Sequence, residues 1–262
     1  NDYGNGMPSR CQAFKVSSRE FDVKAGLEGD TVVAEYSLAS GNIFTVRYTL
    51  LEGGILSVES DFKGVKSSKP VDVPRIGFRM RLPASADSFT YLGRGREENY
   101  ADRFGGTLIG EYSSSASKEY VRYVRPQECG HHIDCEYLSI GGLAIRSDRF
   151  EFNALRCAVE DLDSEEAVQR DYQWENKGPL TENDPAKAKN RLRRQTHIND
   201  YVERDFVEVC VDYAQSGVGG YDSWGSRPDG DRCLWSDRDY SFRFAIVPAR
   251  AMGVRKSLGF DF

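Results

Sequence analysis

An all-β fold of two packed antiparallel sheets is predicted by three properties of the sequence. Segments in which apolar and polar residues alternate recur along the chain, glycine-rich turns separate them, and helical patterns are few. Alternation with a period of two places the apolar side chains on one face of a strand, and this face is buried when two sheets pack together. The chain has 262 residues, 39% of them hydrophobic, and we expect a single domain over residues 1–262.

The alternation is clearest between Phe44 and Leu50. One face there carries Phe44, Val46, Tyr48 and Leu50, and the other carries Thr45, Arg47 and Thr49. Turn sequences Gly41-Asn42 and Glu52-Gly53-Gly54 flank this segment. The same reasoning predicts further strands at Thr31–Tyr36, Ile55–Phe62, Ile76–Leu82, Tyr120–Val124, Leu143–Ile145, Phe150–Leu155, Phe206–Asp212 and Tyr240–Val247.

Helix is predicted only in the middle of the chain. Asp163 is a candidate N-cap with Glu166 three residues later, and Asp184-Pro185 places a proline in the first turn of a second candidate helix. The polar stretch 174–196 has the composition of a surface insertion.

Composition narrows the classes of function. A net charge of −6 argues against an extended nucleic-acid surface, and the basic cluster between Lys187 and Arg194 is interpreted as a solvated helix face. The sequence lacks an apolar run of about 18 residues, so we expect no membrane span. Six cysteines are too few for a disulfide-built scaffold, and Cys210, in an apolar run, is expected to be a buried thiol. Because the chain opens at Asn1 without a leader pattern, we interpret it as a piece of a longer polypeptide.

A glycine-rich segment from Gly217 to Gly225 presents a single indole, Trp224. Glycines permit tight backbone conformations, and an exposed indole offers a flat apolar face with one N–H donor, which suits a sugar. The alternative is a β-turn whose tryptophan folds into its own core, since large aromatic side chains are buried on average.

The segment from Tyr91 to Arg103 combines glycines, aromatic residues and charges. A phosphate-binding loop is excluded because Glu98 occupies the place of the third glycine, where an acid would repel a pyrophosphate. The preferred interpretation is a structural cluster rather than direct ligand contact. In this cluster Arg94, Arg96 and Arg103 would pair with Glu97, Glu98 and Asp102.

The segment from Cys129 to Cys135 contains ligand types that zinc accepts. The ligands would be Cys129, His131 and Cys135, with His132 as a further candidate. Adjacent strand residues point to opposite faces, so His131 and His132 could not both bind one ion without a sharp turn. We therefore expect no metal and favour a hairpin edge with exposed histidines.

Glycoside hydrolysis needs two carboxylates across the scissile bond. Among 41 acids the best local candidates are Glu98, Asp102 and Glu128, although each is equally explained as the partner of a nearby arginine. The sequence contains no Gly-x-Ser-x-Gly elbow, and His197 has no nearby nucleophile.

Taken together, these segments resemble the C-terminal, small-chain domain (domain 5) of the bacterial β-galactosidases of glycoside hydrolase family 2. The family motif Tyr-x-Gly-x-Gly-Pro-x-Glu-x-Tyr-x-Asp-Arg is met by Tyr91, Gly93, Gly95, Glu98, Tyr100, Asp102 and Arg103, with Arg96 in place of the proline. The motif Pro-(Gln/Ser)-Glu-x-Gly-x-Arg is met by Pro126, Gln127, Glu128 and Gly130, with His132 in place of the arginine. The third motif is the segment Gly217 to Gly225, and the opening segment around Gly4 also resembles the family.

The resemblance implies an antiparallel supersandwich like that of the galactose mutarotases, here truncated at its N-terminal side. It further implies that the catalytic glutamates lie in a barrel domain of a parent β-galactosidase, so that this chain has no catalytic residue and is inactive alone. Substrate contacts are expected from Trp224, Asp222 and Ser223, and a lid loop from Gly4, Asn5 and Gly6.

The partners implied are the barrel and other domains of the same enzyme, a galactoside, and further copies of the parent. Mg and Na in such enzymes are held mainly by other domains, so no cofactor is assigned to this chain. The compartment, bacterial cytoplasm or periplasm, is left open. Two other functions are kept as alternatives: a mutarotase-like epimerase using a histidine acid with Glu128 as base, and a non-catalytic carbohydrate-binding module.

Overall fold

The fold is built from antiparallel strands in the part of the chain that the computed structural model describes, residues 21–28, 31–38, 40–123, 128–162, 201–222 and 226–249. Each strand pairing in these residues is antiparallel. The two predicted helices and the insertion 174–196 lie outside the described residues. No helix in the described part is long and apolar enough to cross a membrane.

One large sheet and one small sheet contain all the described strands. The large sheet has 11 strands in the order β1-β2-β3-β4-β13-β10-β9-β7-β8, with β11 pairing both β10 and β6, and the small sheet pairs β12 with β5. The bounds are β1 (Phe21–Glu28), β2 (Thr31–Leu38), β3 (Ile43–Leu51), β4 (Ile55–Lys63), β5 (Asp72–Val73), β6 (Arg75–Pro83), β7 (Ser88–Arg94), β8 (Ile109–Ser115), β9 (His131–Ile140), β10 (Leu143–Leu155), β11 (Phe206–Gln215), β12 (Leu234–Trp235) and β13 (Tyr240–Pro248). Short 3-10 turns are η1 (Glu52–Gly54), η2 (Val159–Leu162) and η4 (Gly230–Arg232).

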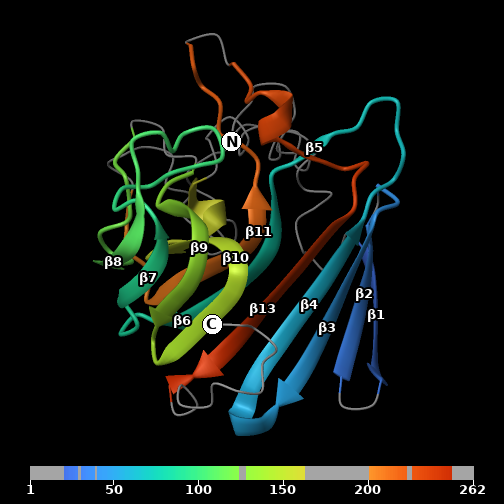
Figure 1. Cartoon of the computed structure of the whole chain (residues 1–262), viewed down its shortest axis with the longest axis horizontal. Helices are drawn as coiled ribbons and strands as arrows, with labels where there is room; N and C mark the ends of the chain where they lie inside the picture. Colours follow the sequence, from blue (N-terminus) through green and yellow to red (C-terminus); the bar gives the residue numbers. More distant parts are fainter. Residues whose placement is uncertain are drawn as a thin grey trace, which may run out of the picture.

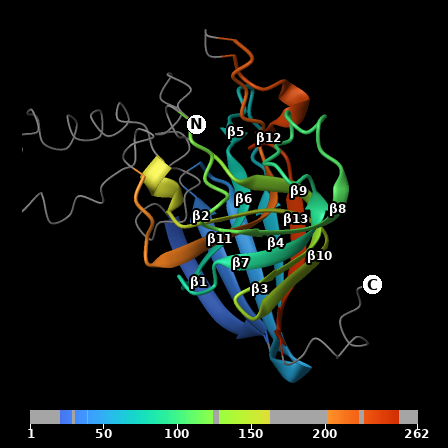
Figure 2. The same ribbon diagram turned by 90° about the vertical axis from the view of Figure 1, so that its left-hand side faces the viewer.

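Strand β10 joins the two layers of the sandwich. Its first part, at Leu143–Arg146, pairs with β13, and its second part, at Glu151–Leu155, pairs with β11. The register between β9 and β10 shifts on both sides of Phe150, so the strand bends where it passes from one layer to the other. Figures 1 and 2 show the result: β1 to β4 with β13 form one layer, and β6 with β11 lies across them.

Aromatic side chains fill the space between the layers. Phe78 of β6 lies with its ring centroid 6.0 Å from that of Phe44 on β3 and 5.2 Å from that of Phe244 on β13. Phe152 of β10 packs edge-on against Phe89 of β7 at 5.7 Å. The predicted all-β sandwich is therefore confirmed, with its two layers continuous through β10.

The alternation of apolar residues located seven of the strands. β2, β3, β4, β6, β11 and β13 lie where the sequence predicts them, and the two segments predicted within residues 143–155 are one strand, β10. The strand predicted at Tyr120–Val124 is wrong, because residues 120–123 are irregular. The remaining strands were not predicted from the sequence: β1, β5, β7, β8, β9 and β12.

Burial agrees with the prediction inside the sheet and departs from it at one end. Val46 is buried with 1% of its surface exposed, and Cys210 is a buried thiol as expected. Leu50 was assigned to the same apolar face as Val46 but is 66% exposed, because it lies at the end of β3 beside the η1 turn.

Candidate functional site

The carboxylate of Glu98 links two loops that follow β7 and precede β9. It accepts hydrogen bonds from the Tyr100 hydroxyl at 3.0 Å and from the backbone N–H of Gly130 at 2.8 Å. Its other oxygen accepts from Arg103 and Tyr123. The ion pair between Arg103 and Glu98 is therefore confirmed, and four donors occupy this carboxylate.

Arg94 pairs outside its own segment, which corrects the prediction that its partner is a neighbouring acid. Its guanidinium donates to Asp134 on β9 at 2.7 Å. Asp134 has a positive φ of 56° at the β9 irregularity and also pairs with Arg149 at 2.6 Å. The left-handed backbone aims this carboxylate at both guanidinium groups.

Asp102 anchors the glycine-rich loop, which we define as residues Gly217 to Asp222. One carboxylate oxygen accepts the backbone N–H of Val218 at 3.0 Å. The other accepts the backbone N–H of Gly219 at 2.8 Å and the Tyr221 hydroxyl at 3.0 Å. Three hydrogen bonds donated by the loop thus end on this one side chain. The prediction that Asp102 pairs with an arginine is replaced by this contact.

Two glycines make this close contact possible. A Cβ atom at Gly217 would lie 2.6 Å from the Cγ atom of Asp102. Gly219 has a φ of +66°, and a Cβ there would lie 2.5 Å from the carbonyl oxygen of Ser226. Gly217 is therefore required for space, and Gly219 is required both for space and for backbone conformation.

The loop is also held where it leaves β11. The backbone N–H of Gln215 donates to Glu151 at 2.7 Å, and that of Ser216 donates to the Pro74 carbonyl at 2.8 Å. The Ser216 hydroxyl donates to the Val73 carbonyl at 2.7 Å. The beginning of the loop is therefore fixed by β10 and by the chain around β5 and β6.

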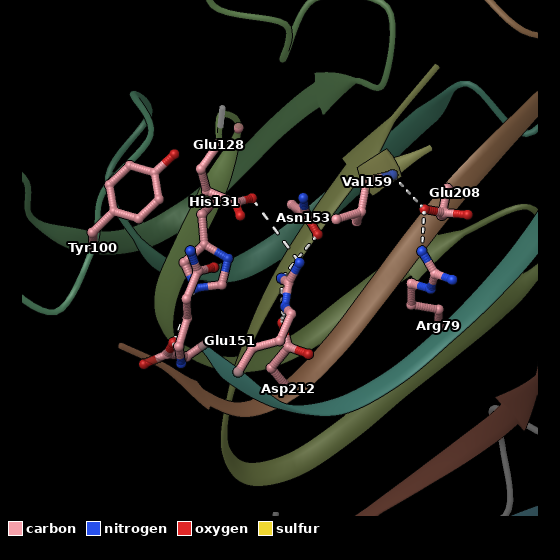
Figure 3. A network of polar contacts seen from close by, with 12 residues as sticks. Arg79, Tyr100, Glu128, His131, Glu151, Asn153, Val159, Glu208 and Asp212 are labelled. Atoms are coloured by element: carbon pink, nitrogen blue, oxygen red, sulfur yellow. Dashed lines mark hydrogen bonds and ion pairs between the residues drawn. The ribbon is translucent and has the colours of Figure 1, made fainter. Parts of the chain in front are cut away.

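A buried polar cluster lies beside this end of the loop (Figure 3). Arg75 of β6 donates to one oxygen of Asp212 through two nitrogens, at 2.6 and 3.2 Å. Glu128 lies further from Arg75, at 4.0 Å. Burial raises the pKa of Asp212 to about 6, although Arg75 acts in the opposite direction.

His131 of β9 pairs with Glu151 of β10 in the same cluster. The imidazole Nε2 lies 2.9 Å from the carboxyl oxygen that also accepts Gln215. Burial raises the pKa of Glu151 to about 8, and burial together with Arg75 lowers the pKa of His131 to about 4. Both shifts favour the neutral forms of the two groups.

His132 faces the other side of β9 and pairs with Glu119 at 2.9 Å. Its second nitrogen lies 3.2 Å from the Tyr91 hydroxyl, which is 2.6 Å from the carbonyl oxygen of Gly95. A carbonyl oxygen cannot donate, so the Tyr91 proton goes to Gly95 and the imidazole donates to Tyr91. Both nitrogens of His132 are thus satisfied.

The expected exposed histidines are a wrong prediction. His131 and His132 are both fully buried, because loops and the core cover β9 on its two faces. They do point to opposite sides, as the strand geometry requires. Cys129 packs with Leu155 in a separate apolar cluster.

The described residues hold no group of three or more histidine, cysteine, aspartate or glutamate side chains arranged to bind a metal ion. Within this part of the chain, the zinc ligand set considered from the sequence, Cys129, His131 and Cys135, does not converge on one point. The Cys135 sulfur lies instead beside β7, at the position where a side chain on Gly93 would need to be.

Comparison with known proteins identifies the family. Residues 1–246 match the sequence model of a family described as "Beta galactosidase small chain". The chain belongs to this family.

The relatives include several proteins that carry the name Beta-galactosidase. The protein of Priestia megaterium is 29% identical over 260 residues, covering 95% of this chain and 22% of the relative. The protein of Streptococcus thermophilus is 28% identical, with 95% and 22% covered, and that of Actinobacillus pleuropneumoniae is 26% identical, with 87% and 19% covered. The chain spans about a fifth of the length of these relatives.

The structure places some of the small-chain motif residues that the sequence predicts. Asp222 is described, and its carboxylate accepts the backbone N–H of Ser226 at 3.3 Å. Glu128 lies near Arg75. Several predicted site residues lie outside the described residues: Ser223, Trp224, Gly4, Asn5, Gly6, Pro126 and Gln127.

The residues around the end of β11, where the chain enters the glycine-rich loop, were not predicted from the sequence. Glu151 and Arg75 lie in strands where they read as ordinary polar positions. Arg75 and its partner Asp212 are 137 positions apart. No local pattern signals such a contact; an acid inside the apolar run Phe150 to Leu155 is the one hint available.

Proposed function

We propose that this chain is the part of a β-galactosidase that completes the substrate site and supports assembly, within a parent that hydrolyses terminal β-D-galactosides. The observation that carries the proposal is the anchoring of the glycine-rich loop by Asp102. One carboxylate that accepts three hydrogen bonds fixes the loop as far as Tyr221, three positions before Trp224 in the sequence. Preorganised aromatic side chains bind a sugar without the cost of ordering a mobile loop.

The roles of the individual residues follow from this anchor and from the family. Trp224 stacks on the galactoside, Asp222 and Ser223 contact it, and the segment Gly4 to Gly6 forms a lid. The catalytic glutamates and the Mg and Na ions belong to other domains of the parent, which also supply the partners for assembly.

Catalysis by the isolated chain is not supported by the carboxylates selected from the sequence. Glu98 and Asp102 already accept hydrogen bonds from several donors each. A glycosidase acid and nucleophile must instead face the scissile bond from both sides. We infer that the chain contributes binding and not bond cleavage.

The epimerase alternative receives less support. It needs an accessible histidine acid near a glutamate base, but His131 and His132 are fully buried and pair with Glu151 and Glu119. Glu128, the base considered from the sequence, lies near Arg75 instead.

The test uses the full-length parent enzyme and a chromogenic β-galactoside. Trp224→Ala removes the stacking face, and we expect KM to rise up to about tenfold, since an aromatic stack contributes roughly 0.5 to 1.5 kcal/mol beyond its buried area. Asp102→Asn keeps the side-chain size but loses acceptor capacity, and it should raise KM in the same direction. Asp229→Asn is the matched control, because Asp229 is an exposed acid of the neighbouring turn with no side-chain capping bond. Unchanged KM and kcat in both test variants would falsify the proposal.

A further inference from the structure

Glu151 lies where the glycine-rich loop begins. Its carboxyl group is buried, with 4% of the residue exposed, and one oxygen accepts the backbone N–H of Gln215 at 2.7 Å. The same oxygen lies 2.9 Å from Nε2 of His131. One buried oxygen therefore joins β9, β10 and the last residue of β11.

His131 extends this contact to the second support of the loop. Its ring stacks on Tyr100 with centroids 5.5 Å apart and an angle of 17° between the planes (Figure 3). The Tyr100 hydroxyl donates to Glu98, and Asp102 follows Tyr100 by two positions. The pair of Glu151 and His131 thus contacts the last residue of β11, which leads into the loop, and the segment that carries Asp102, the anchor of the loop.

The pair is surrounded by charged groups from every neighbouring strand. Arg75 of β6 is already bonded to Asp212 of β11. The titratable groups that act on Glu151 besides His131 are Arg75 on β6, Asp134 and Cys135 on β9, Arg149 on β10 and Asp212 on β11. Both cations among these groups already pair with an acid, Arg75 with Asp212 and Arg149 with Asp134, so a charge on Glu151 would add a third carboxylate to two guanidinium groups.

We propose that Glu151 and His131 are a positioning pair that holds the glycine-rich loop in place through a neutral carboxyl group, and that ionisation of Glu151 favours an opened loop. The inference rests on the proposed function for its effect on substrate, but its contacts do not depend on that function. Burial raises the pKa of Glu151 to about 8, whereas the hydrated carboxyl of an opened loop has an ordinary pKa near 4.5.

The direction of the pH dependence follows from linkage. A group whose pKa is raised in the closed state stabilises that state fully below pH 4.5, and this stabilisation is lost as the pH rises through about 8. Between these limits the equilibrium constant for opening increases by up to about tenfold for each pH unit. Above pH 8 it becomes constant.

Hydrogen exchange of the full-length parent, followed by mass spectrometry, tests the proposal. Peptides that cover Gln215 to Tyr221 report loop opening after correction for the intrinsic exchange rate. We expect opening in the native protein to rise with pH between 5 and 8, and Glu151→Gln to remove this rise, since the amide is neutral and keeps both contacts. Glu119→Gln is the matched control: it changes a buried glutamate paired with the adjacent histidine, and it should leave the loop's pH dependence intact.

Two outcomes overturn the inference. One is a flat pH dependence of loop opening in the native protein, which needs no variant to be measured. The other is an equal dependence of loop opening on pH in Glu151→Gln and the native protein, with the amides of the core strands protected in both.

As a second readout, KM for a β-galactoside should rise toward pH 8 in the native enzyme more than in Glu151→Gln, with kcat changing in parallel for both. An inactive parent with the expected exchange pattern would contradict the proposed function and leave the positioning pair standing.

Discussion

The two histidine–glutamate pairs of β9 have the same nitrogen-to-oxygen distance and are both buried, yet their remaining polar atoms have different partners. Both imidazoles are fully buried and lie 2.9 Å from their carboxyl partners. On the core side, His132 pairs with Glu119, and its second imidazole nitrogen is hydrogen-bonded to the Tyr91 hydroxyl. On the loop side, the second nitrogen of His131 has no hydrogen-bond partner among the described residues, and Glu151 accepts the backbone N–H of Gln215, the residue of β11 that leads into the loop.

Burial alone therefore does not define the role of an ionisable pair. A fully satisfied pair inside a core contributes to one rigid arrangement, and its loss exposes unpaired polar groups to an apolar environment. In a partly satisfied pair next to a loop, a change in protonation changes the position of that loop. Two adjacent residues of one strand thus serve stability on one face and loop position on the other.

The largest expected effect comes from replacing each histidine in turn with phenylalanine. His132→Phe removes one hydrogen-bond partner from each of the buried groups Glu119 and Tyr91, and we expect a loss of about 3 to 5 kcal/mol in the free energy of opening of the core. His131→Phe preserves a ring against Tyr100 and should cost about 1 to 2 kcal/mol. Native-state hydrogen exchange of β7 and β9 amides in the full-length parent measures both. Equal costs for the two variants would remove the distinction between the pairs.

A smaller loss of core stability is expected when the Tyr91 hydroxyl, which bonds the pair of His132 and Glu119, is removed. Tyr91→Phe loses the hydrogen bonds to Gly95 and His132, and we expect the core to lose about 1 to 3 kcal/mol of protection. The glycine-rich loop should keep its native exchange. Tyr112→Phe is a control on the neighbouring strand, since its exposed hydroxyl bonds only a turn carbonyl. Loop exchange that changes as much as core exchange would show that the two sides are not separate.

Glycine substitutions in the loop separate close packing from backbone conformation. Gly219→Ala and Gly220→Ala both place a side chain at positive φ, +66° and +78°. Only the first also brings a Cβ to 2.5 Å from a backbone oxygen, whereas nothing lies within 4 Å of the second. We expect Gly219→Ala to raise KM about tenfold more than Gly220→Ala, with core exchange unchanged, because a displaced backbone costs roughly 1 to 3 kcal/mol. The opposite order would mean that the contact with Ser226 is not needed.

The smallest effect is expected at the exposed end of the anchor. Tyr221→Phe removes one of three hydrogen bonds to Asp102 at a residue that is 57% exposed. Solvent competes for such a bond, so loop opening should change by about 0.5 to 1 kcal/mol. Peptides covering the loop report this change by hydrogen exchange. If Tyr221→Phe changed loop opening as much as Asp102→Asn does, the hydrogen bond from the Tyr221 hydroxyl would hold the loop, and the two backbone N–H bonds would not.

Much of the fold could be predicted because half-buried strands alternate visibly. β7 and β9 escaped detection for physical reasons: Gly93 interrupts the apolar pattern of β7 to admit the sulfur of Cys135, and β9 begins with two histidines. β9 is covered on both faces, so the rule that polar strand residues face solvent fails there. The exposed histidines were predicted from that rule.

The site was less accessible to sequence reasoning. The motif resemblance selected Asp102 and the glycine-rich loop independently, but their contact joins residues 116 positions apart. Nearby arginines made an ion pair the simpler expectation for Asp102, and only the folded chain shows backbone N–H groups in their place. Contacts of this kind depend on the strand order, which alternation does not determine.

The position of β13 bears on how the chain folds during synthesis. This strand fills the place between β4 and β10, and Ser60 pairs with Phe242, a residue made 182 positions later. Until the ribosome has delivered β13, the β4 edge is an unpaired ladder of N–H and C=O groups, which invites pairing with other chains. Contacts so distant along the sequence also slow the search for the native state. We therefore expect the nascent chain to depend on chaperones for longer than a domain built from neighbouring hairpins.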